Sequence, residues 1–349
     1  MMSREQYHTL LNIAVHAPSG DNAQPWRFVV GEDTIDLFNI PGKDSSPYNF
    51  VERGSFFAHG TVIENLCVLF SAEGYATQVS LFPTSDPDHV ARLIVAEGGA
   101  RDDGRLAPLI TLRRTNRKPY RKMSLSTAHI QAMSESGKTM ITDQKVIADL
   151  AKTVSLSDRL IFEDKSIHDA IFSSIRWTPE EEREKKGLYI KTLELPPPAQ
   201  ILFKRLKNWN FLKILNHIGI SKLIAAQSAK GYAASSAMGV ITMESDDKKN
   251  FVRAGQRFQR LWLIATEQGI SLQPVTALAY LAQRITAEAP LDLSPEHQDE
   301  IMKADKNIRG IFGIGNEPIA MIFRMGYGED PTAQSQKTEA HITYTEVRQ

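Results

Sequence analysis

Six cationic side chains lie within ten consecutive positions, from Arg113 to Lys122, with no acidic residue among them. Thr115 adds a short hydroxyl donor beside the arginines. Guanidinium groups donate paired hydrogen bonds to phosphate oxygens. A solvated surface loop is the alternative. Nucleic-acid binding fits less well, because the chain as a whole has a formal net charge of zero. We therefore predict that this segment binds one discrete phosphate group.

A second candidate segment is the loop from Ala17 to Trp26, which reads Ala-Pro-Ser-Gly-Asp-Asn-Ala-Gln-Pro-Trp. Its prolines and glycine order the backbone, and its short polar side chains supply many donors. Ser19, Asn22 and backbone N–H groups of such a loop can face a planar heteroaromatic ligand. An ordinary capped turn is the alternative. However, polar amide groups that lie as close together as those around Gln24 need hydrogen-bond partners.

Regular elements on both sides must hold these two loops. Ser3 is placed to cap a helix that Pro18 ends, and Gly74 is placed to end a longer one. The expected helices are 3–16, 56–73, most of 126–172, and 250–268 with two more after it; the expected strands are 26–30 and 35–40 as an antiparallel hairpin, 78–82, 90–95, 240–243 and 319–325. The polar residues from 330 onward are expected to be poorly anchored.

One internal repeat occurs at an offset of 195 residues. Residues 60–78 align with residues 255–273, with four identities (Gly, Leu, Gly, Gln) in 19 positions. Both segments predict an amphipathic helix that ends at a glycine and continues into an extended stretch. Two helices of one architecture can reach this similarity by chance. Duplication is the more useful hypothesis, because it predicts an architecture of two halves.

The composition is that of an ordinary globular protein, with 42% hydrophobic and 23% charged residues. It excludes intrinsic disorder, and 349 residues suit two domains or one large one. The single cysteine, Cys67, excludes an intramolecular disulfide. The N-terminus carries no apolar stretch for a signal peptide, and no window of about 18 residues is apolar enough to span a membrane. We expect a cytoplasmic protein.

Several other residues are not expected to form sites. The nine histidines are dispersed and form no His-x-x-x-His pair, so we predict no metal site. His16 and His59 are interpreted as helix residues rather than bases. Cys67 lies on an apolar helix stripe and is predicted to be a small core residue. Phe258 and Trp262 are also interpreted as core residues at helical spacing.

The stretch from Gln200 to Lys230 is both basic and amphipathic. It contains six lysine and arginine residues, no acidic residue, and many leucines, isoleucines and aromatic residues. This pattern alone could lie on a membrane surface. Packing over another element is the commoner outcome in a protein of many helices. We therefore predict that the stretch covers the active site as a lid or builds a subunit interface.

Together, the arginine segment and the proline–serine loop resemble motifs of the nitroreductase family of FMN-dependent oxidoreductases. That family carries an Arg-Arg-Ser-x-Arg phosphate motif, matched here from Arg113 to Arg117 with threonine in place of serine. Its Ala-Pro-Ser-x-x-Asn-x-Gln-Pro-Trp loop is matched from Ala17 to Trp26. Residues 255–269 resemble the family's long core helix, and residues 321–328 its terminal Gly-Tyr strand. Residues 125–235 are poorly matched.

The resemblance implies an α+β fold with a central, mostly antiparallel sheet wrapped by helices. The motif order departs from ordinary family members, because here the loop precedes the arginine motif by some ninety residues. In those members each flavin lies between two subunits, which supply one motif each. A fused pseudo-dimer with one FMN per chain explains the order, and it resembles the two-lobed branch that includes the mycobacterial Acg proteins. We expect an N-terminal half (1–108), a C-terminal half (109–330) with the lid at about 180–232, and a tail (331–349).

The resemblance also implies the residues that bind FMN. The phosphate and ribityl chain are assigned to the arginine motif, the ring and ribityl chain to the loop, and the ring edge at N5 and O4 to backbone N–H groups of residues 273–276. The implied cofactor-binding residues are Pro18, Ser19, Gly20, Asn22, Gln24, Arg113, Arg114, Thr115, Arg117, Gln273, Pro274, Val275, Thr276 and Arg324. A basic residue near the C-terminus usually completes the phosphate site, and Arg324, Lys337 and Arg348 are all candidates.

The implied activity is electron transfer from NAD(P)H through FMN to a nitroaromatic, a quinone or a similar acceptor, with no catalytic side chain, because the cofactor performs the difficult step. The alternative is a protein that only binds or sequesters flavin beneath its lid. The expected partners are NAD(P)H and a small acceptor, with no nucleic acid and no membrane span. The chain is expected to act as a monomer, through its internal pseudo-dimer, or as a homodimer.

Overall fold

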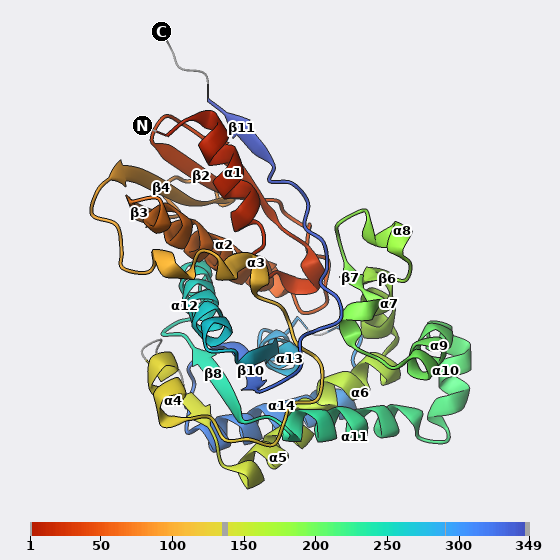
Figure 1. The fold of residues 1–349 in the computed structure, drawn as a ribbon. Coiled ribbons are helices and arrows are strands. Elements are labelled where there is room, and N and C mark those ends of the chain that lie inside the picture. The colour runs from red at the N-terminus through yellow and green to blue at the C-terminus, as the bar shows by residue number, and fades with distance from the viewer. Residues whose placement is uncertain (1, 135–138, 290, 346–349) are drawn as a thin grey trace.

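The N-terminal part of the chain forms a five-stranded sheet beside one long helix (Figure 1). Its strand order is β11-β1-β2-β4-β3, and all pairs are antiparallel except β11 with β1. The elements are α1 (Arg4–Ala14), β1 (Trp26–Val30), β2 (Thr34–Asn39), α2 (Arg53–Ala72), β3 (Tyr75–Leu81), β4 (His89–Glu97) and β11 (Ile342–Tyr344). The structure is a computed structural model and describes residues 2–134, 139–289 and 291–345.

Local sequence explains the ends of these elements. The Ser3 side chain accepts from the Gln6 N–H and the Gln6 side chain accepts from the Ser3 N–H, which forms a capping box at the start of α1. Gly74 follows α2 with φ of 82°, a conformation that glycine adopts without a steric penalty. The predicted helix, hairpin and strands of this part are therefore confirmed.

A second, four-stranded sheet has the order β5-β8-β10-β9, and all its pairs are antiparallel. Its elements are α4 (Thr127–Ser134), β5 (Thr139–Ile141), β8 (Ala237–Thr242), α12 (Lys248–Glu267), β9 (Ser271–Pro274) and β10 (Ile319–Gly326). The order matches the first sheet strand for strand: β5, β8, β10 and β9 correspond to β1, β2, β4 and β3, with α12 in the place of α2. The predicted α+β class with two fused halves is confirmed, although each half has its own sheet.

The two equivalent helices pack against each other and exchange reciprocal contacts. Arg260 forms an ion pair with Glu64, with 2.7 Å between Nη2 and Oε1. Gln259 donates to Asn65, with 2.7 Å between Nε2 and Oδ1. Because the offset of 195 places residue 64 opposite 259 and residue 65 opposite 260, each contact is the counterpart of the other. Such reciprocity is the property of a two-fold interface.

The remaining helices surround the second sheet or extend away from it to one side (Figure 1). Near this sheet, α5, α13 and α14 pack around a second hydrophobic core, while a third, smaller core lies among α6, α7, α9 and α10. The bounds are α3 (Leu109–Leu112), α5 (Gln144–Val154), α6 (Leu156–Glu163), α7 (Lys165–Ser174), β6 (Ile175–Arg176), α8 (Pro179–Glu182), β7 (Leu188–Tyr189), α9 (Pro197–Leu206), α10 (Trp209–Asn216), α11 (Ile220–Ala233), α13 (Ala277–Thr286) and α14 (Pro295–Phe312).

The C-terminal segment is held by hydrogen bonds at several points between Thr332 and Thr345, so for these residues the expectation of a poorly anchored tail was wrong. It runs back from the second half to the first, where β11 pairs in parallel with β1 and places Ile342 opposite Phe28 (Figure 1). Thr338 donates from its N–H and its hydroxyl to the Gln24 side chain, at 2.9 and 3.0 Å. The polar composition of the tail does not predict a strand there. The strand forms because the backbone groups at the open edge of β1 supply its hydrogen-bond partners.

One helix among the described residues, Phe50–Ala72, is long and apolar enough to cross a membrane. In the structure, 94% of an apolar 18-residue window within this helix is buried inside the protein. The helix is α2, the centre of the core that joins the two halves. Its apolar composition is therefore explained by packing.

Candidate functional site

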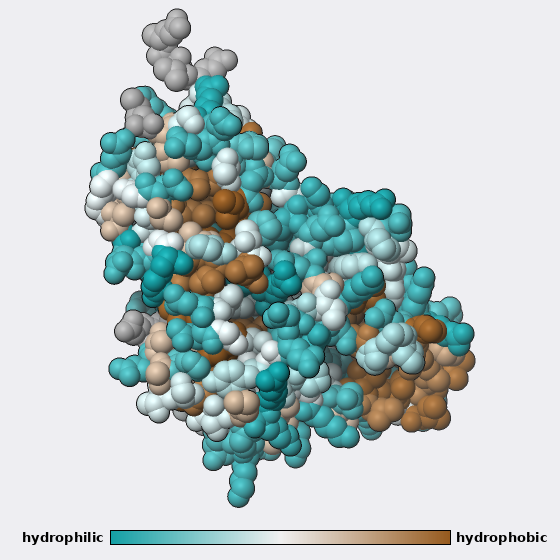
Figure 2. All heavy atoms as spheres, viewed as in Figure 1, coloured by the Kyte–Doolittle hydropathy of each residue, from teal (hydrophilic) through white to brown (hydrophobic). Residues whose placement is uncertain are grey.

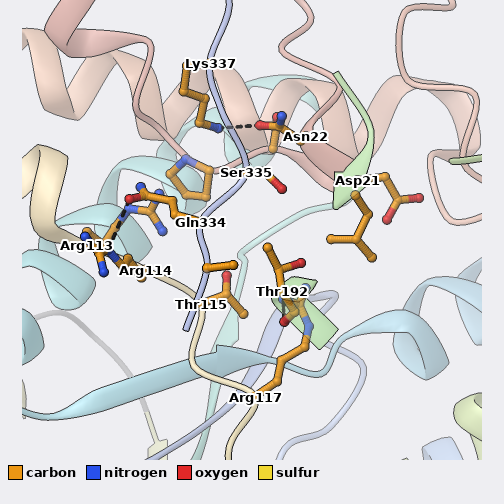
Figure 3. Close-up of a pocket in the computed structure, with 14 residues that line it drawn as sticks. Asp21, Asn22, Arg113, Arg114, Thr115, Arg117, Thr192, Gln334, Ser335 and Lys337 are labelled. Atoms are coloured by element: carbon orange, nitrogen blue, oxygen red, sulfur yellow. Dashed lines mark hydrogen bonds between the residues drawn. The ribbon is translucent and has the colours of Figure 1, made fainter. Parts of the chain in front are cut away.

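Two adjoining cavities lie where the proline–serine loop of the first half meets the second half. Both are lined by Pro18, Ser19 and Asp21. The empty space between the lining atoms, including the part that is open to solvent, is about 610 Å³ in the first and about 1100 Å³ in the second. The first cavity is also lined by Asn22, Arg113, Arg114, Thr115, Arg117, Leu188, Thr192, Ala333, Gln334, Ser335 and Lys337 (Figure 3).

The first cavity is cationic, and Arg113 is its most deeply buried charge. One Arg113 Nη atom donates to the His16 carbonyl at 2.9 Å, and the guanidinium lies 4.3 Å from the centre of the Trp262 ring. Its Nε atom is buried and has no hydrogen-bond partner. Burial lowers the pKa of Arg113 to about 9. A buried cation with an unused donor is suited to an anion in the cavity.

The other residues of the arginine motif line the same cavity and are less constrained. Arg114 is exposed, and its Nε atom donates to the Gln334 side chain at 3.1 Å (Figure 3). Arg117 donates from Nη1 to the Thr192 carbonyl at 3.0 Å, and burial lowers its pKa. Thr115 forms an isolated bridge with Leu272 of β9. The motif is thus joined to the second sheet and faces the loop of the first half.

The loop from Ala17 to Trp26 has an unusual backbone, with positive φ at Asp21 (44°), Asn22 (60°) and Gln24 (53°). Residues other than glycine adopt this region at a cost, so neighbouring contacts must hold it. Ser19 Oγ accepts from the Gln24 N–H at 3.0 Å. At Gly20, a Cβ atom would lie 2.7 Å from a carboxylate oxygen of Asp44, so a larger residue would require the Asp44 side chain to move.

Gln24 is one predicted site residue that lines neither cavity. Its side chain lies behind the loop, where Oε1 accepts from Thr338 and Nε2 donates to the carbonyls of Asn22 and Lys185. All of its hydrogen-bonding atoms are therefore used within the protein. Its contribution is to hold the strained loop against the C-terminal segment, rather than to contact a ligand in the cavity.

Lys337 is the C-terminal basic residue that lines the cationic cavity. Its Nζ atom donates to Asn22 Oδ1 at 2.7 Å (Figure 3). It also donates to the Ala17 carbonyl at 2.9 Å. Burial lowers the pKa of Lys337 to about 7, with a further contribution from the nearby Arg113. The same surroundings lower the pKa of His16. Lys337 therefore carries a charge that a bound anion would stabilise.

Arg324 lies elsewhere and lines neither cavity. It is buried in β10, where its guanidinium donates to Gln273 Oε1 at 2.7 Å and to the Lys118 carbonyl at 2.9 Å. It also stacks 4.0 Å from the centre of the Tyr120 ring. Through these contacts Arg324 connects β9, β10 and the arginine segment. Arg348, the third candidate, lies outside the described residues.

The second cavity is aromatic and acidic. Its walls include Phe57, Phe258 and Trp262 from the two long helices, so the last two are core residues, as predicted, that also face a cavity. Three carboxylates, three tyrosines and no lysine, arginine or histidine line it among the described residues; the ionisable residues are Asp21, Asp44, Asp158, Tyr48, Tyr232 and Tyr280.

Burial shifts these carboxylates toward their neutral forms. It raises the pKa of Asp44 to about 7, and the nearby Asp21 contributes in the same direction. The pKa values of Asp21 and Asp158 are raised as well, in each case mainly by burial. Asp158 accepts from the Tyr232 hydroxyl at 2.8 Å, which partly offsets this effect. The cavity therefore holds poorly solvated carboxyl groups, and one of them, Asp44, changes charge near neutral pH.

Residues 273–276 line the second cavity, but the backbone N–H group of Val275 is already hydrogen-bonded within the protein. The Val275 N–H donates to the Ile322 carbonyl at 2.8 Å, and Thr276 Oγ1 accepts from the Ile322 N–H and donates to its carbonyl. The Gln273 side chain is held by Arg324. The segment thus lines the cavity with its residues, while the Val275 N–H donates to β10 instead of pointing to a ligand.

The sequence also left several lining residues unassigned. Asp44 lies in an irregular loop, Asp158 and Tyr232 lie in the poorly matched region, and Thr192 and Gln334 belong to no motif. Only tertiary structure brings them together. The predicted lid contributes Leu188 and Thr192 to the first cavity and Tyr232 to the second, whereas α9 and α10 line neither.

Two other predicted roles concern residues outside the cavities. Cys67 is buried in α2, where burial raises the pKa of its thiol to about 11, and this confirms a core position. His59 is also buried in α2, its pKa is lowered by burial to about 3, and its Nε2 lies 3.0 Å from Asn39 Oδ1. Within the described ranges, no group of three or more His, Cys, Asp or Glu residues is arranged to hold a metal ion.

The fold and the paired cavities define a two-lobed α+β protein with a cationic cavity next to an aromatic chamber, and known proteins are similar to it in sequence. The chain is 24% identical over 335 residues to Rv3131 of Mycobacterium tuberculosis, provisionally named an NAD(P)H nitroreductase, covering 93% of this chain and 85% of that protein. It is 26% identical over 180 residues to acg of the same organism, which is provisionally named in the same way, covering 49% and 54%. The resemblance to the nitroreductase family and its Acg branch is confirmed.

Other comparisons give longer or weaker matches. The protein MT1398 of M. tuberculosis is 24% identical over 339 residues, which cover 94% of this chain and 46% of that protein, so the chain spans about half the length of this relative. No protein-family model matches. Among solved structures, a Bacteroides fragilis nitroreductase with bound FMN has a TM-score of 0.36 and 13% identity, covering 70% of this chain and 98% of that one. An FMN-dependent nitroreductase of Mycobacterium smegmatis in complex with NADPH has a TM-score of 0.36 and 13% identity, covering 65% and 90%.

Proposed function

We propose that the protein is an FMN-dependent oxidoreductase that takes electrons from NAD(P)H and delivers them to a small aromatic acceptor. The observation that carries this proposal is the junction of a cationic cavity with an aromatic one, lined from both halves of the chain. When bound, FMN would supply the two-electron chemistry, and the protein would supply its binding, orientation and electrostatics.

The cationic cavity suits the phosphate group of FMN. The buried Arg113 Nε has no partner, and Lys337 has a pKa lowered to about 7, so both groups would gain from a nearby dianion. Arg114, Thr115 and Arg117 add further donors from the same segment. Lys337 takes the role of the C-terminal basic residue, and Arg324 is assigned to support β9 instead.

The aromatic chamber suits the flavin ring and the acceptor. Pro18, Ser19 and Gly20 form one wall from the first half, and Gln273, Pro274 and their neighbours form another from the second half. Three carboxylates in the chamber would repel anionic molecules wherever they ionise. Neutral nitroaromatics and quinones, or cationic aromatic compounds, are therefore the acceptors that the chamber favours.

The two halves would act as two subunits do in a family dimer, since the loop comes from one half and the arginine motif from the other. On this proposal one chain binds one FMN as an internal pseudo-dimer, with halves at 1–108 and 109–330. The chain would act on small molecules in the cytoplasm, alone or as a homodimer. Reciprocal contacts between the two long helices support this part of the proposal.

A protein that only sequesters flavin is the second candidate. Leu188 and Thr192 of the lid, together with Gln334 and Ser335 of the C-terminal segment, wall the cationic cavity, which favours slow exchange of its ligand. Both candidates use the same binding residues. They differ in whether a nicotinamide can reach the ring.

Anaerobic stopped-flow spectroscopy separates the two candidates. The purified protein is loaded with FMN, mixed with NADPH or NADH, and followed by the visible absorbance of oxidised flavin. Rapid bleaching, followed by recovery on addition of a nitroaromatic or quinone, is expected for the oxidoreductase. Tight binding without bleaching by either nicotinamide over minutes would assign the protein to flavin sequestration. Failure to take up FMN would contradict both candidates.

A further inference from the structure

The helices α9, α10 and α11 have two apolar faces, and only one of them is buried. On the inner face, Leu206 and Leu212 are buried in the third core together with Phe162 and Phe172 of α6 and α7. This face satisfies the prediction that the amphipathic stretch packs over another element. The second apolar face needs a different explanation.

The outer face of α9–α11 concentrates exposed apolar side chains. Of eleven large apolar side chains exposed in the described part of the chain, six lie within residues 201–223. Four of them are more than three-fifths exposed, and Figure 2 shows an apolar patch over α9 and α10 at the side of the molecule. The outer face consists of Ile201 (63% exposed), Leu202 (39%), Phe211 (36%), Ile214 (67%), Ile218 (81%) and Leu223 (66%).

Exposed cations lie along the same three helices. Between positions 200 and 230 the sequence has six lysine and arginine residues and no acidic residue. All six are exposed, and none forms an ion pair with a residue that the structure describes. The six are Lys204, Arg205, Lys207, Lys213, Lys222 and Lys230. The face therefore combines bare hydrocarbon with uncompensated positive charge, in a chain whose net charge is zero.

This charge distribution argues against a second copy of the chain as the partner. A two-fold interface places the same surface of both subunits together, so six cations would meet six cations without an acidic counterpart. An anionic phospholipid bilayer offers complementary charge together with a hydrocarbon layer. Helices that lie in the bilayer interface have such a composition, with aliphatic or aromatic side chains below and lysines that reach the headgroups.

We propose that the outer face of α9–α11 binds the surface of anionic phospholipid bilayers and holds the protein there as a peripheral protein. The helices lie along the bilayer, and no helix crosses it. Because α11 carries Leu223 of the outer face near its start and Tyr232, which lines the aromatic chamber, near its end, one helix connects the bound face with the candidate site. The proposal rests on the outer face alone, so it holds whichever function the cavities serve.

Vesicle flotation with the full-length protein tests this proposal. Vesicles of phosphatidylcholine alone are compared with vesicles that also contain phosphatidylglycerol, at low and at physiological salt. We expect flotation with the anionic vesicles only, weakened by salt because surface charges are screened. No flotation with anionic vesicles at low salt would overturn the proposal, and equal flotation with both vesicle types would overturn its electrostatic part.

Two variants locate the binding surface. The first variant combines Ile214→Ser with Ile218→Ser and removes exposed hydrocarbon. The second combines Lys204→Gln, Lys213→Gln and Lys222→Gln and removes three charges. The loss of three charges should weaken partitioning to anionic vesicles roughly a hundredfold. The matched controls are Val51→Ser, which is 62% exposed elsewhere, and Lys249→Gln, which is exposed at the start of α12. Circular dichroism and FMN binding check that each variant is folded.

The controls and the oligomeric state decide between partners. Loss of flotation in both α9–α11 variants but in neither control supports the proposal. Equal flotation of all variants would overturn it by placing the membrane contact on another surface. Sedimentation is measured without lipid: a dimer that dissociates on Ile218→Ser, together with no vesicle binding, would assign the face to a second copy instead.

Discussion

Gly60 of α2 and Gly255 of α12, which stand 195 positions apart in the chain, face each other where the two helices cross. A Cβ atom on Gly60 would lie 1.9 Å from the Val252 carbonyl oxygen, and one on Gly255 would lie 2.0 Å from the Phe57 carbonyl oxygen. Residues 57 and 252 are also separated by 195 positions. The closest approach between the two halves is therefore symmetric, and it coincides with the first identity of the sequence repeat.

The crossing predicts a large effect of a very small substitution. Gly60→Ala places a methyl group against backbone atoms that cannot move without separating the halves, so we expect a loss of at least about 1 to 3 kcal/mol in the free energy of unfolding. Urea denaturation measures this loss. Gly310→Ala is the matched control, because Gly310 lies in α14 with no atom within 4 Å of an added Cβ. The control should be neutral or stabilising by up to about 1 kcal/mol. Equal stability of Gly60→Ala and wild type would contradict the close crossing.

Local patterns in the sequence predicted most elements that hold the site. The capped helix after Ser3, the hairpin of β1 and β2, and the long helices α2 and α12 each carry a periodicity or a stop signal within a few residues. The repeat, although it contains only four identities, predicted an architecture of two halves. The arginine motif and the proline–serine loop meet in space, as expected from their resemblance to family motifs.

Features that depend on distant partners could not be predicted in this way. The short strands β5 and β11 have three residues each, too few for a sequence pattern, and they form because a neighbouring strand offers an open edge. The contact of Lys337 with Asn22 joins positions 315 residues apart. The carboxylates Asp44 and Asp158 belong to no motif, and only the folded chain places them in one chamber.

The phosphate assignment predicts that Arg114 affects FMN and not riboflavin. Arg114 is exposed and its only side-chain hydrogen bond in the described structure is with Gln334, so Arg114→Ala should leave the fold intact. Loss of one charged donor should weaken FMN binding roughly ten- to a hundredfold. Riboflavin, which lacks the phosphate, should bind both proteins equally. Fluorescence titration measures both affinities. Arg121→Ala, an exposed cation of the same segment outside both cavities, is the control. A parallel loss of riboflavin binding would contradict a phosphate role.

The lowered pKa of Lys337 predicts that FMN binding depends on pH. Its pKa is lowered to about 7, so in the free protein it loses its charge as the pH rises through this value. A bound phosphate favours the charged form, and binding above pH 7 therefore takes up a proton. The dissociation constant of FMN should rise between pH 7 and 9, by at most about tenfold per pH unit. In Lys337→Gln the constant should be larger at pH 7 and should change less between pH 7 and 8 than in the wild type, whereas the loss of charge of Arg113, whose pKa is lowered to about 9, should raise the constant of both proteins toward pH 9. A wild-type constant that stays level across this range would exclude Lys337 as the responsive group.

The raised pKa of Asp44 predicts that the stability of the FMN-free protein depends on pH. Burial raises its folded-state pKa to about 7, whereas an unfolded aspartate has a pKa near 3.9. Between these values the folded state binds more protons, so the contribution of Asp44 to stability falls as the pH rises and its full cost is present above pH 7. Asp44→Asn keeps an oxygen that can accept from the Ser46 N–H and removes the charge.

The Asp44→Asn variant should therefore melt at a higher temperature than wild type at pH 8, with a gain on the order of 1 to 3 kcal/mol. This gain should shrink toward pH 5, where the wild-type carboxyl is neutral in the folded state. Thermal melts of both proteins across this range measure the difference. Asp33→Asn, an exposed substitution in the turn between β1 and β2, should show no such trend. If the Asp44→Asn gain were the same at pH 5 and pH 8, the carboxyl would not be titrating near neutrality, and the acidic character proposed for the aromatic chamber would have to come from Asp21 and Asp158 alone.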